Sequence, residues 1–274
     1  MGRRRRNARV PTRRGNRHLT KSALVALLAL AAGVAGAQQR TLPQAALRSG
    51  ITFSGPDVRA LQADESANPG MLWVQRGGEL WAAVAPGGSC ASCHRATESM
   101  RGVAARYPAF DRSTAEVVDL DARINACRVQ HQRLPALPRE SDDLLALSAY
   151  VAYQSRGVPL SVSIDGPAKA SFDRGNALFH TRHGQMNLSC AQCHDENWGK
   201  RLLAENISQG HGNAFPAYRL EWQTLGSLQR RIRACYFGVR AEMPAPGARE
   251  LTDLELYLAW RAQGLKMEAP GVRR

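Results

Sequence analysis

Two short motifs in this sequence combine paired cysteines with an adjacent histidine. They are Cys90-Ala-Ser-Cys93-His94 and Cys190-Ala-Gln-Cys193-His194, both of the form C-x-x-C-H. This form is the attachment motif of c-type haem. Its two thiols can form thioethers with the vinyl groups on one edge of the porphyrin, and its histidine can bind the iron from one face. The motifs therefore predict two covalently bound haem c groups, with His94 and His194 as axial ligands of the irons.

A zinc site or a redox-active dithiol is the simpler alternative for a single C-x-x-C. Structural zinc sites usually have four protein ligands, often from two such pairs. Neither motif has a second C-x-x-C nearby, and the full C-x-x-C-H form occurs twice in one chain. The pair of motifs therefore favours haem over zinc.

The other two cysteines lie at equivalent positions of an internal repeat. The segment 107–110, Tyr-Pro-Ala-Phe, matches 215–218, Phe-Pro-Ala-Tyr, at an offset of 108 residues. The same offset brings Cys127 onto Cys235, and a later segment, 149–157, matches the chain at an offset of 107. The chain therefore contains two copies of one module, each with a haem motif and one downstream cysteine.

The second axial ligand of each haem has several candidates. Such ligands are usually Met, His or Cys. Only Cys127 and Cys235 align between the modules, so we predict them as thiolate ligands of the first and second iron. The alternatives are His131, His211 and Met243. A cysteine packed as a small apolar group and a disulfide between Cys127 and Cys235 also stay open, although the disulfide would join equivalent points of two separate modules.

Arginines are denser around the second of these cysteines than around the first. Arg123 precedes Cys127 by four residues and Arg231 precedes Cys235 by four, a spacing that places each pair on one face of a helix. A cationic neighbour favours the thiolate form of cysteine, and a guanidinium can bind an oxyanion with two hydrogen bonds. The second module adds three more arginines, Arg230, Arg233 and Arg240. For Arg230, an ordinary solvated side chain is an equally good interpretation.

The spacing of apolar residues predicts that both modules are mostly helical. Leu225, Leu228 and Ile232 share one face of a helix predicted over 225–234. Thr252 and Glu255 fit the capping-box pattern, which predicts a final helix starting there and ending near residue 264.

A corresponding helix is predicted over 141–157 of the first module. Residues 158–168, which contain two prolines, are the predicted linker, and 38–70 form an irregular lead-in. We therefore predict a mainly α fold with two tandem cytochrome-c-like haem domains over 38–160 and 161–274.

The first 37 residues have the composition of a secretory signal peptide. They contain nine of the 37 basic residues and none of the 23 acidic ones, followed by the apolar stretch LVALLALAAGVAG and the small residues 35–37. The apolar stretch is short for a membrane span of about 20 residues, so cleavage after Ala37 is favoured over a membrane anchor. Export to the periplasm is predicted, with the Sec and twin-arginine routes both open and no membrane span in the mature chain.

The formal charge of +14 does not indicate a nucleic-acid partner. Without the first 37 residues the chain has 28 basic and 23 acidic residues, a formal charge of only +5. A basic surface of the kind that binds nucleic acid is therefore not indicated by composition, and we predict no such partner.

The paired haem motifs, the paired cysteines and the segment ACYFGVRAEMP, 234–244, resemble those of the SoxA family. Its members are dihaem cytochrome c subunits of a periplasmic complex with the monohaem cytochrome SoxX. The resemblance implies an L-cysteine S-thiosulfotransferase that joins thiosulfate to a cysteine of the carrier SoxYZ and passes electrons to a cytochrome c. It implies that Cys235 is catalytic and can carry an extra sulfur as a persulfide. It also implies that Arg231 contacts substrate, and we add Arg240 from the same segment.

Two other functions compete with this one. A thiosulfate dehydrogenase would couple two thiosulfates into tetrathionate without a carrier protein. A plain electron-transfer cytochrome would show no dependence of sulfur chemistry on Arg231, and Met243 would be its expected ligand at the second iron.

Overall fold

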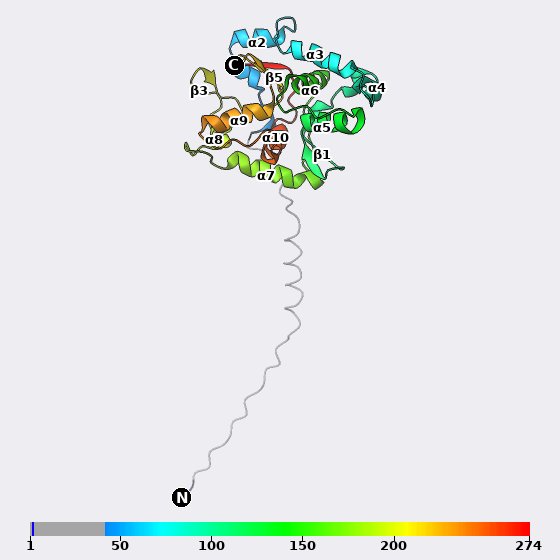
Figure 1. Cartoon of the computed structure of the whole chain (residues 1–274). Helices are drawn as coiled ribbons and strands as arrows, with labels where there is room; N and C mark the ends of the chain where they lie inside the picture. Colours follow the sequence, from blue (N-terminus) through cyan, green and yellow to red (C-terminus); the bar gives the residue numbers. More distant parts are fainter. Residues whose placement is uncertain (1, 3–41) are drawn as a thin grey trace. The chain divides into compact units, whose positions relative to one another are not determined.

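The computed structural model describes residues 42–274 and the isolated Gly2, and Figure 1 shows its elements in chain order. Apart from Gly2, the predicted signal peptide over 1–37 lies outside the described residues. Thr41–Arg274 packs as one unit. In the part of the chain that the structure describes, no helix combines the length and the apolar character that crossing a membrane requires.

The same run of elements occurs twice: a long helix, a haem-motif helix, a β-hairpin, a helix with the lone cysteine of that repeat (Cys127 or Cys235) and a final long helix. In the first repeat these are α3 (Met71–Ala82), α4 (Cys90–His94), β1 and β2 (Ala109–Asp111 and Glu116–Val118), α5 (Leu120–Cys127) and α6 (Asp142–Gln154). In the second they are α7 (Lys169–His180), α8 (Cys190–His194), β5 and β6 (Ala217–Arg219 and Thr224–Gly226), α9 (Leu228–Gly238) and α10 (Arg249–Arg261). The predicted repeat is therefore also a repeat of structure.

Shorter elements connect and extend the two runs. The 3₁₀ helices are η1 (Gln44–Ala46), η2 (Gly50–Phe53), η3 (Thr97–Met100), η4 (Ala104–Arg106) and η6 (Gly166–Ala168), and η5 (Arg128–Gln132) is a π-helical turn. The others are α2 (Pro56–Ala63), the hairpin β3–β4 (Arg201–Leu202 and Glu205–Asn206) and β7 (Gly271–Arg273). The last strand pairs in parallel with β5, so the second hairpin becomes the three-stranded sheet β6–β5–β7.

The two long helices of each repeat cross at a glycine. A Cβ atom on Gly77 of α3 would lie 2.1 Å from the carbonyl oxygen of Ala146 in α6, and one on Gly175 of α7 would lie 2.0 Å from that of Asp253 in α10. Cβ atoms essentially never come within 3.0 Å of such an atom, so both crossings need glycine. Ala146 and Asp253 are themselves 107 residues apart, which makes the two crossings equivalent.

Each repeat places its hairpin on the core of the other. Phe110 and Val117 of the first hairpin pack against the buried core formed by α7, α9 and α10. Their counterparts Tyr218 and Leu225 pack in the core between α3 and α6 of the first repeat. Separating the repeats would expose both apolar contacts to water, which explains why the described chain packs as one unit.

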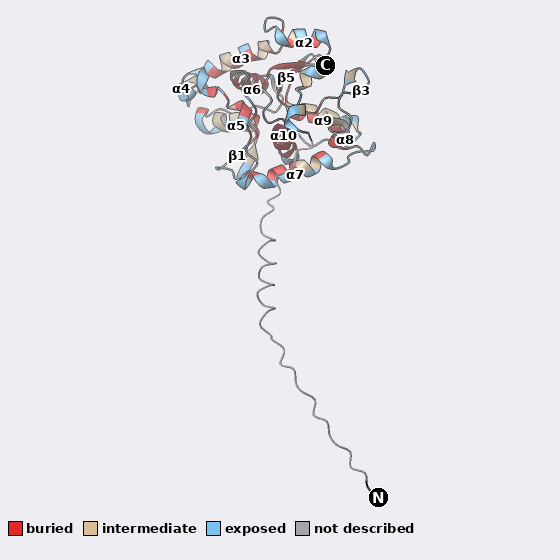
Figure 2. Ribbon diagram, turned by 180° about the vertical axis from the view of Figure 1, so that it is seen from behind, coloured by how far each residue is buried: buried red, intermediate tan, exposed pale blue. Residues whose placement is uncertain are grey.

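This exchange leaves α10 enclosed on several sides. All residues over Leu251–Arg261 are buried, and Figure 2 shows the helix in red near the middle of the described chain. The helix α10 begins earlier than predicted. Its first residue is Arg249 and its N-cap is Ala248, whereas the sequence predicted Thr252 as the N-cap. Thr252 is therefore a buried interior residue, and the prediction that Thr252 and Glu255 form a capping box was wrong.

Three other predicted segments also differ from the structure. Leu225 belongs to β6, and α9 begins at Leu228 behind Ser227, whose Oγ accepts a hydrogen bond from the Arg230 N–H at 3.1 Å. Residues 158–168 are not a free linker, since Pro159 forms a bridge with Lys266 and neighbouring residues are buried. The lead-in predicted as irregular contains α2.

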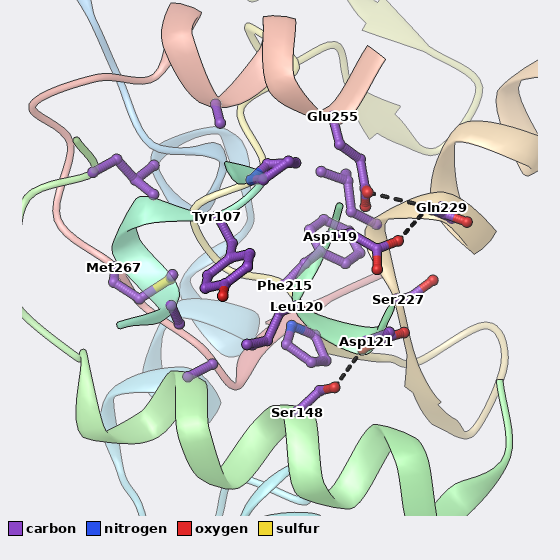
Figure 3. Close-up of a pocket in the computed structure, with 18 residues that line it drawn as sticks. Tyr107, Asp119, Leu120, Asp121, Ser148, Phe215, Ser227, Gln229, Glu255 and Met267 are labelled. Atoms are coloured by element: carbon purple, nitrogen blue, oxygen red, sulfur yellow. Dashed lines mark hydrogen bonds between the residues drawn. The ribbon is translucent and has the colours of Figure 1, made fainter. Parts of the chain in front are cut away.

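A cavity of about 100 Å³ lies where the two repeats meet, and residues of both line it (Figure 3). Its polar wall holds three buried carboxyl groups, those of Asp119, Asp121 and Glu255. Gln229 Nε2 donates to Asp119 Oδ2 at 2.7 Å and to Glu255 Oε2 at 3.1 Å. Ser148 Oγ donates to Asp121. Glu255, predicted as a helix cap, is thus part of the contact between repeats.

Candidate haem centres and active site

Both haem motifs form one turn of helix behind a serine cap. Ser89 Oγ accepts a hydrogen bond from the Ser92 N–H at 3.0 Å at the start of α4. Ser189 Oγ accepts one from the Gln192 N–H at 3.3 Å, and the Gln192 side chain accepts one from the Ser189 N–H at 2.9 Å, which completes a capping box for α8. The caps stabilise turns that are too short to persist alone, and each turn presents two thiols and the following imidazole from one segment.

A hydrogen bond orients the imidazole of His194. Its Nδ1 lies 2.7 Å from the carbonyl oxygen of Ser208, so Nδ1 carries the proton and donates. The lone pair is then on Nε2, the form in which histidine binds iron. Gly210 has φ +74°, and a Cβ there would lie 2.9 Å from the ring, so the loop passes this close only with glycine.

His94 of the first centre has a different support. Its ring stacks on Trp81 of α3, with 5.3 Å between ring centroids and 31° between ring planes. Ser99 Oγ donates to the His94 carbonyl oxygen at 2.8 Å. The two histidines therefore occupy equivalent positions but are held by different contacts.

Cys235 of α9 faces the second haem motif. Its thiol is within hydrogen-bonding reach of His194. Burial, together with the charge of Cys235, raises the pKa of Cys190 to about 12 and also raises that of Cys193. Two thiols, an imidazole and a further sulfur thus converge, and these are the groups that a haem c with histidine and thiolate ligands needs.

Cys127 has the same relation to the first motif. Burial and the charge of Cys127 raise the pKa of Cys90, and burial and the charge of Cys93 raise the pKa of Cys127 itself. All six cysteines over 42–274 are free thiols. The disulfide between Cys127 and Cys235 that the sequence left open is therefore not formed.

The two lone cysteines differ in their electrostatic surroundings. Burial alone would raise the pKa of Cys235, but Arg231, His194 and Arg219 together lower it to about 7. At Cys127 burial prevails over Arg123, and the pKa of the thiol is raised. Equivalent positions on equivalent helices therefore differ in how readily the thiol ionises.

The two arginines predicted to bind substrate lie on either side of the end of α9. Arg231 is half-buried one turn before Cys235. Arg240 is exposed just after the helix, with φ +55°, and its carbonyl oxygen accepts a hydrogen bond from the Gln185 N–H at 3.2 Å. The structure thus brings Arg231 to the thiol, whereas Arg240 is an exposed residue just beyond the end of α9.

The sequence did not single out Arg219, which the structure places at this site. It ends β5, is only 4% exposed and lowers the pKa of Cys235. The repeat holds a signal for it, because the residue 108 positions earlier is Asp111, with the opposite charge.

The competing axial ligands lie in other surroundings. His211 is buried, with Nε2 3.1 Å from Gln209 Oε1. His131 is exposed in η5, and Met243 is 42% exposed beyond the end of α9. Among the candidate axial ligands, the two that lie against the haem motifs are Cys127 and Cys235.

Comparisons with known proteins agree with this arrangement. A family model described as SoxA/TsdA, cytochrome c domain, matches residues 76–160 and 174–267. The chain is 39% identical over 230 residues to the L-cysteine S-thiosulfotransferase subunit SoxA of Pseudaminobacter salicylatoxidans, across 82% of this chain and 80% of that protein. The chain belongs to the SoxA family. The SoxA of Rhodovulum sulfidophilum is also 39% identical, across 83% of this chain and 80% of that protein.

A solved structure extends the family likeness to three dimensions. The crystal structure of SoxXA from P. pantotrophus matches with a TM-score of 0.80 and 37% identity, across 83% of this chain and 87% of that chain. The predicted mainly α fold with two cytochrome-c-like parts is confirmed, with one matched segment of the SoxA/TsdA family model in each repeat. The cytochrome c domain also supports binding of haem c. The domain limits 38–160 and 161–274 stay a prediction.

Proposed function

We propose that this chain is the haem-bearing subunit of an L-cysteine S-thiosulfotransferase. With a monohaem SoxX partner it joins thiosulfate oxidatively to a cysteine of the carrier SoxYZ. The names of its relatives support the activity, and the likeness to a SoxXA complex supports the partner. The observation that carries the proposal is the second centre, where Cys235 faces His194 and Arg231.

Two haem c groups are part of this proposal. Cys90, Cys93, Cys190 and Cys193 would hold them through thioether bonds. His94 and Cys127 would bind the first iron, and His194 and Cys235 would bind the second. When bound, haem accepts electrons one at a time, at a potential set by its axial ligands and surroundings.

The chain's own residues bind and orient the sulfur substrates. Arg231 presents a planar guanidinium to the sulfonate oxygens of thiosulfate. Arg240 supplies a second positive charge just beyond the end of α9, where the carrier approaches. The sulfur of Cys235 lies beside the place where the carrier cysteine reacts, and Cys235 can carry an added sulfur atom as a persulfide.

The overall reaction forms one S–S bond and is an oxidation. The outer sulfur of thiosulfate bonds to the carrier sulfur, the carrier thiol loses its proton to solvent, and two electrons are released. These electrons pass one at a time to an electron-accepting cytochrome c. The first centre, whose cysteine has a raised pKa, takes no part in bond formation in this scheme.

The place of this reaction follows from the predicted signal peptide. Cleavage after Ala37 and export deliver the mature chain to the periplasm. The intact mass of protein purified from the periplasmic fraction checks both points, together with the number of haem groups. A mass that includes residues 1–37 would contradict cleavage.

A carrier-labelling assay tests the activity. Purified holoprotein and its SoxX partner are mixed with reduced SoxYZ, thiosulfate and oxidised cytochrome c. The carrier is expected to gain the mass of one thiosulfonate group as the cytochrome is reduced, and omission of this chain abolishes both changes. Cytochrome reduction with an unmodified carrier would contradict the proposal.

Formation of tetrathionate is the second candidate, because the matching family model joins SoxA with TsdA. A thiosulfate dehydrogenase acts on thiosulfate without a carrier. The same assay without SoxYZ separates the two activities. Tetrathionate formed at the full rate in that mixture favours the dehydrogenase, and its absence favours carrier transfer.

A further inference from the structure

The two repeats differ in charge at one hairpin position near the lone cysteine. Asp111 ends β1, and Arg219 ends β5 at the equivalent place 108 residues later. The same offset relates Arg123 of α5 to Arg231 of α9. Each repeat therefore combines one hairpin residue with one helix arginine, and only the hairpin residue changes sign.

In the first repeat this pair is neutral. Arg123 Nη1 lies 3.2 Å from Asp111 Oδ2; the Arg123 side chain is 45% exposed and that of Asp111 is 11% exposed. Asp111 also accepts a hydrogen bond from the Ser113 N–H at 2.8 Å. Because Arg123 has a counterion within the protein, little positive charge remains there for a ligand.

In the second repeat the equivalent pair consists of two arginines. Arg219 is 4% exposed, and its buried Nε has no hydrogen-bond partner in the described chain. Its Nη2 lies 2.9 Å from Glu221, but that carboxylate is 60% exposed, so water screens the pair. Burial and the charge of Arg231 lower the pKa of Arg219.

The other groups around Arg219 leave its Nε open. Glu205, whose buried Oε1 also has no hydrogen-bond partner in the described chain, attracts it without forming an ion pair, and Arg273 adds positive charge. Trp222 stacks with two guanidiniums, whose Cζ atoms lie 5.1 Å (Arg219) and 4.3 Å (Arg230) from the ring centroid. A buried guanidinium with an unpaired N–H beside a like charge is unfavourable unless an anion completes it.

We propose that Arg219 and Arg231 form one oxyanion site beside Cys235, with Arg219 as its buried inner half. The anion is the sulfonate group of thiosulfate, an assignment that rests on the proposed function. Two guanidiniums offer directional N–H donors to the three sulfonate oxygens. In the first repeat the carboxylate of Asp111 occupies the corresponding position, so that centre has no place for the anion.

A haem carboxylate has the same oxyanion chemistry, so the experiment separates the two sources. Arg219→Gln is made in the holoprotein with its SoxX partner. Thiosulfate Kd is measured by calorimetry without the carrier, and kcat and KM are measured in the transfer assay. We expect Kd and KM for thiosulfate to rise about tenfold, equivalent to about 1.4 kcal/mol, and kcat to change less than about threefold. Arg219→Lys keeps the charge and restores part of the affinity.

Two matched variants serve as controls. Arg230→Gln makes the same chemical change at the other guanidinium that stacks on Trp222. Asp111→Asn changes the equivalent hairpin position of the first repeat. Both keep the wild-type Kd for thiosulfate. An equal loss of affinity in Arg230→Gln would show that any lost positive charge in this region weakens thiosulfate binding. That result would overturn the assignment of Arg219 to the anion site.

Haem content, circular dichroism and the reduction potential of the second centre are measured for each variant. If Arg219→Gln keeps its haem and its thiosulfate Kd is unchanged, the inference is wrong. A changed potential or haem content with unchanged Kd assigns Arg219 to a haem carboxylate and also overturns the inference.

If Arg219→Gln does not fold, Arg219→Lys is tested for a smaller rise in Kd. A wild-type protein that binds thiosulfate but does not label the carrier refutes the proposed function and leaves the anion site standing.

Discussion

At the scale of single residues, the chain contains its own control for the proposed active site. Cys127 and Cys235 lie at equivalent positions and face equivalent haem motifs. They differ in their neighbours, because Arg123 is paired with Asp111 whereas Arg231 has no such partner in the hairpin. The chemistry that we assign to the second centre therefore depends on the charges around the sulfur more than on the sulfur itself.

This difference gives a prediction for the helix arginines. Arg231→Gln removes charged hydrogen bonds worth about 1.5–3 kcal/mol each, so kcat/KM for thiosulfate in the transfer assay should fall by about 10- to 100-fold. Arg123→Gln is the matched change at the first centre and should leave kcat/KM within about twofold. Equal effects of the two substitutions would remove the distinction between the centres.

The haem motifs could be predicted from the sequence because covalent attachment fixes both residue types and spacing, and Cys127 and Cys235 could be predicted because they align in the internal repeat. Arg219 could not be found in the same way. An internal repeat is recognised by residues that are identical in its two copies. This position is informative for the opposite reason, because Asp111 and Arg219 differ. Its burial and its open Nε depend on how β5 packs, which no local pattern specifies.

At the scale of elements, the haem motifs are held by crossed pairs of long helices. The crossing of α7 with α10 brings Gly175 against the backbone of Asp253, and the crossing of α3 with α6 does the same with Gly77 and Ala146. A side chain at either glycine would push the helices apart, and the short motif helices α4 and α8 contact α3 and α7.

The second crossing can be tested by Gly175→Ala. The added methyl group would overlap the Asp253 carbonyl oxygen, and overpacking of this kind costs about 1–3 kcal/mol or more. We expect the free energy of unfolding to fall by at least about 2 kcal/mol and haem incorporation at the second motif to drop.

Gly238→Ala is the control for this change. Gly238 ends α9 and has nothing within 4 Å of the added Cβ. Alanine there should leave stability unchanged or raise it by up to about 1 kcal/mol. Denaturant unfolding and haem content compare the two variants, and equal stability of both would show that the crossing tolerates a side chain.

The helices themselves were predictable from apolar spacing, but their starts were not. Thr252 and Glu255 have the residue types of a capping box, yet α10 begins one turn earlier, and both side chains are buried within the protein. Glu255 is buried in the polar wall of the cavity, where it accepts a hydrogen bond from Gln229 of α9. A contact between segments distant in sequence therefore overrides the local cap signal.

At the scale of the whole molecule, the repeats meet through exchanged hairpins and a buried polar cluster. Asp119 caps α5, which leads to Cys127, and Ser227 caps α9, which leads to Cys235. Arg139 Nη1 lies 2.5 Å from Asp119 Oδ2, so part of the cluster's negative charge is balanced. The two helices with the lone cysteines thus start at one shared site between the repeats (Figure 3).

The cluster predicts a pH dependence of stability. Burial, and then the charge of Asp119, raise the pKa of Asp121 from 3.8 to about 7. Between these values the folded state holds a proton that the unfolded state has lost, so this group makes the free energy of unfolding fall as pH rises from about 4 to about 7. Asp121→Asn removes the effect. Relative to wild type, the variant should gain stability on the order of 2–4 kcal/mol between pH 4 and pH 8.

Thermal or denaturant unfolding of both proteins across this pH range checks the prediction. Asp143→Asn is the control, because Asp143 is an exposed partner of Arg76 and its replacement should shift stability little at any pH. A difference between wild type and Asp121→Asn that stays constant with pH would contradict a raised pKa for Asp121.

The central claim is that sulfur transfer takes place at Cys235 and not at its twin. The most direct measurement compares Cys235→Ala with Cys127→Ala, each with its SoxX partner, reduced SoxYZ and thiosulfate, by the intact mass of the carrier. Haem content confirms that both variants are loaded at both C-x-x-C-H motifs. We predict that Cys127→Ala still adds the thiosulfonate group to the carrier and that Cys235→Ala does not. Full labelling by Cys235→Ala would contradict the account.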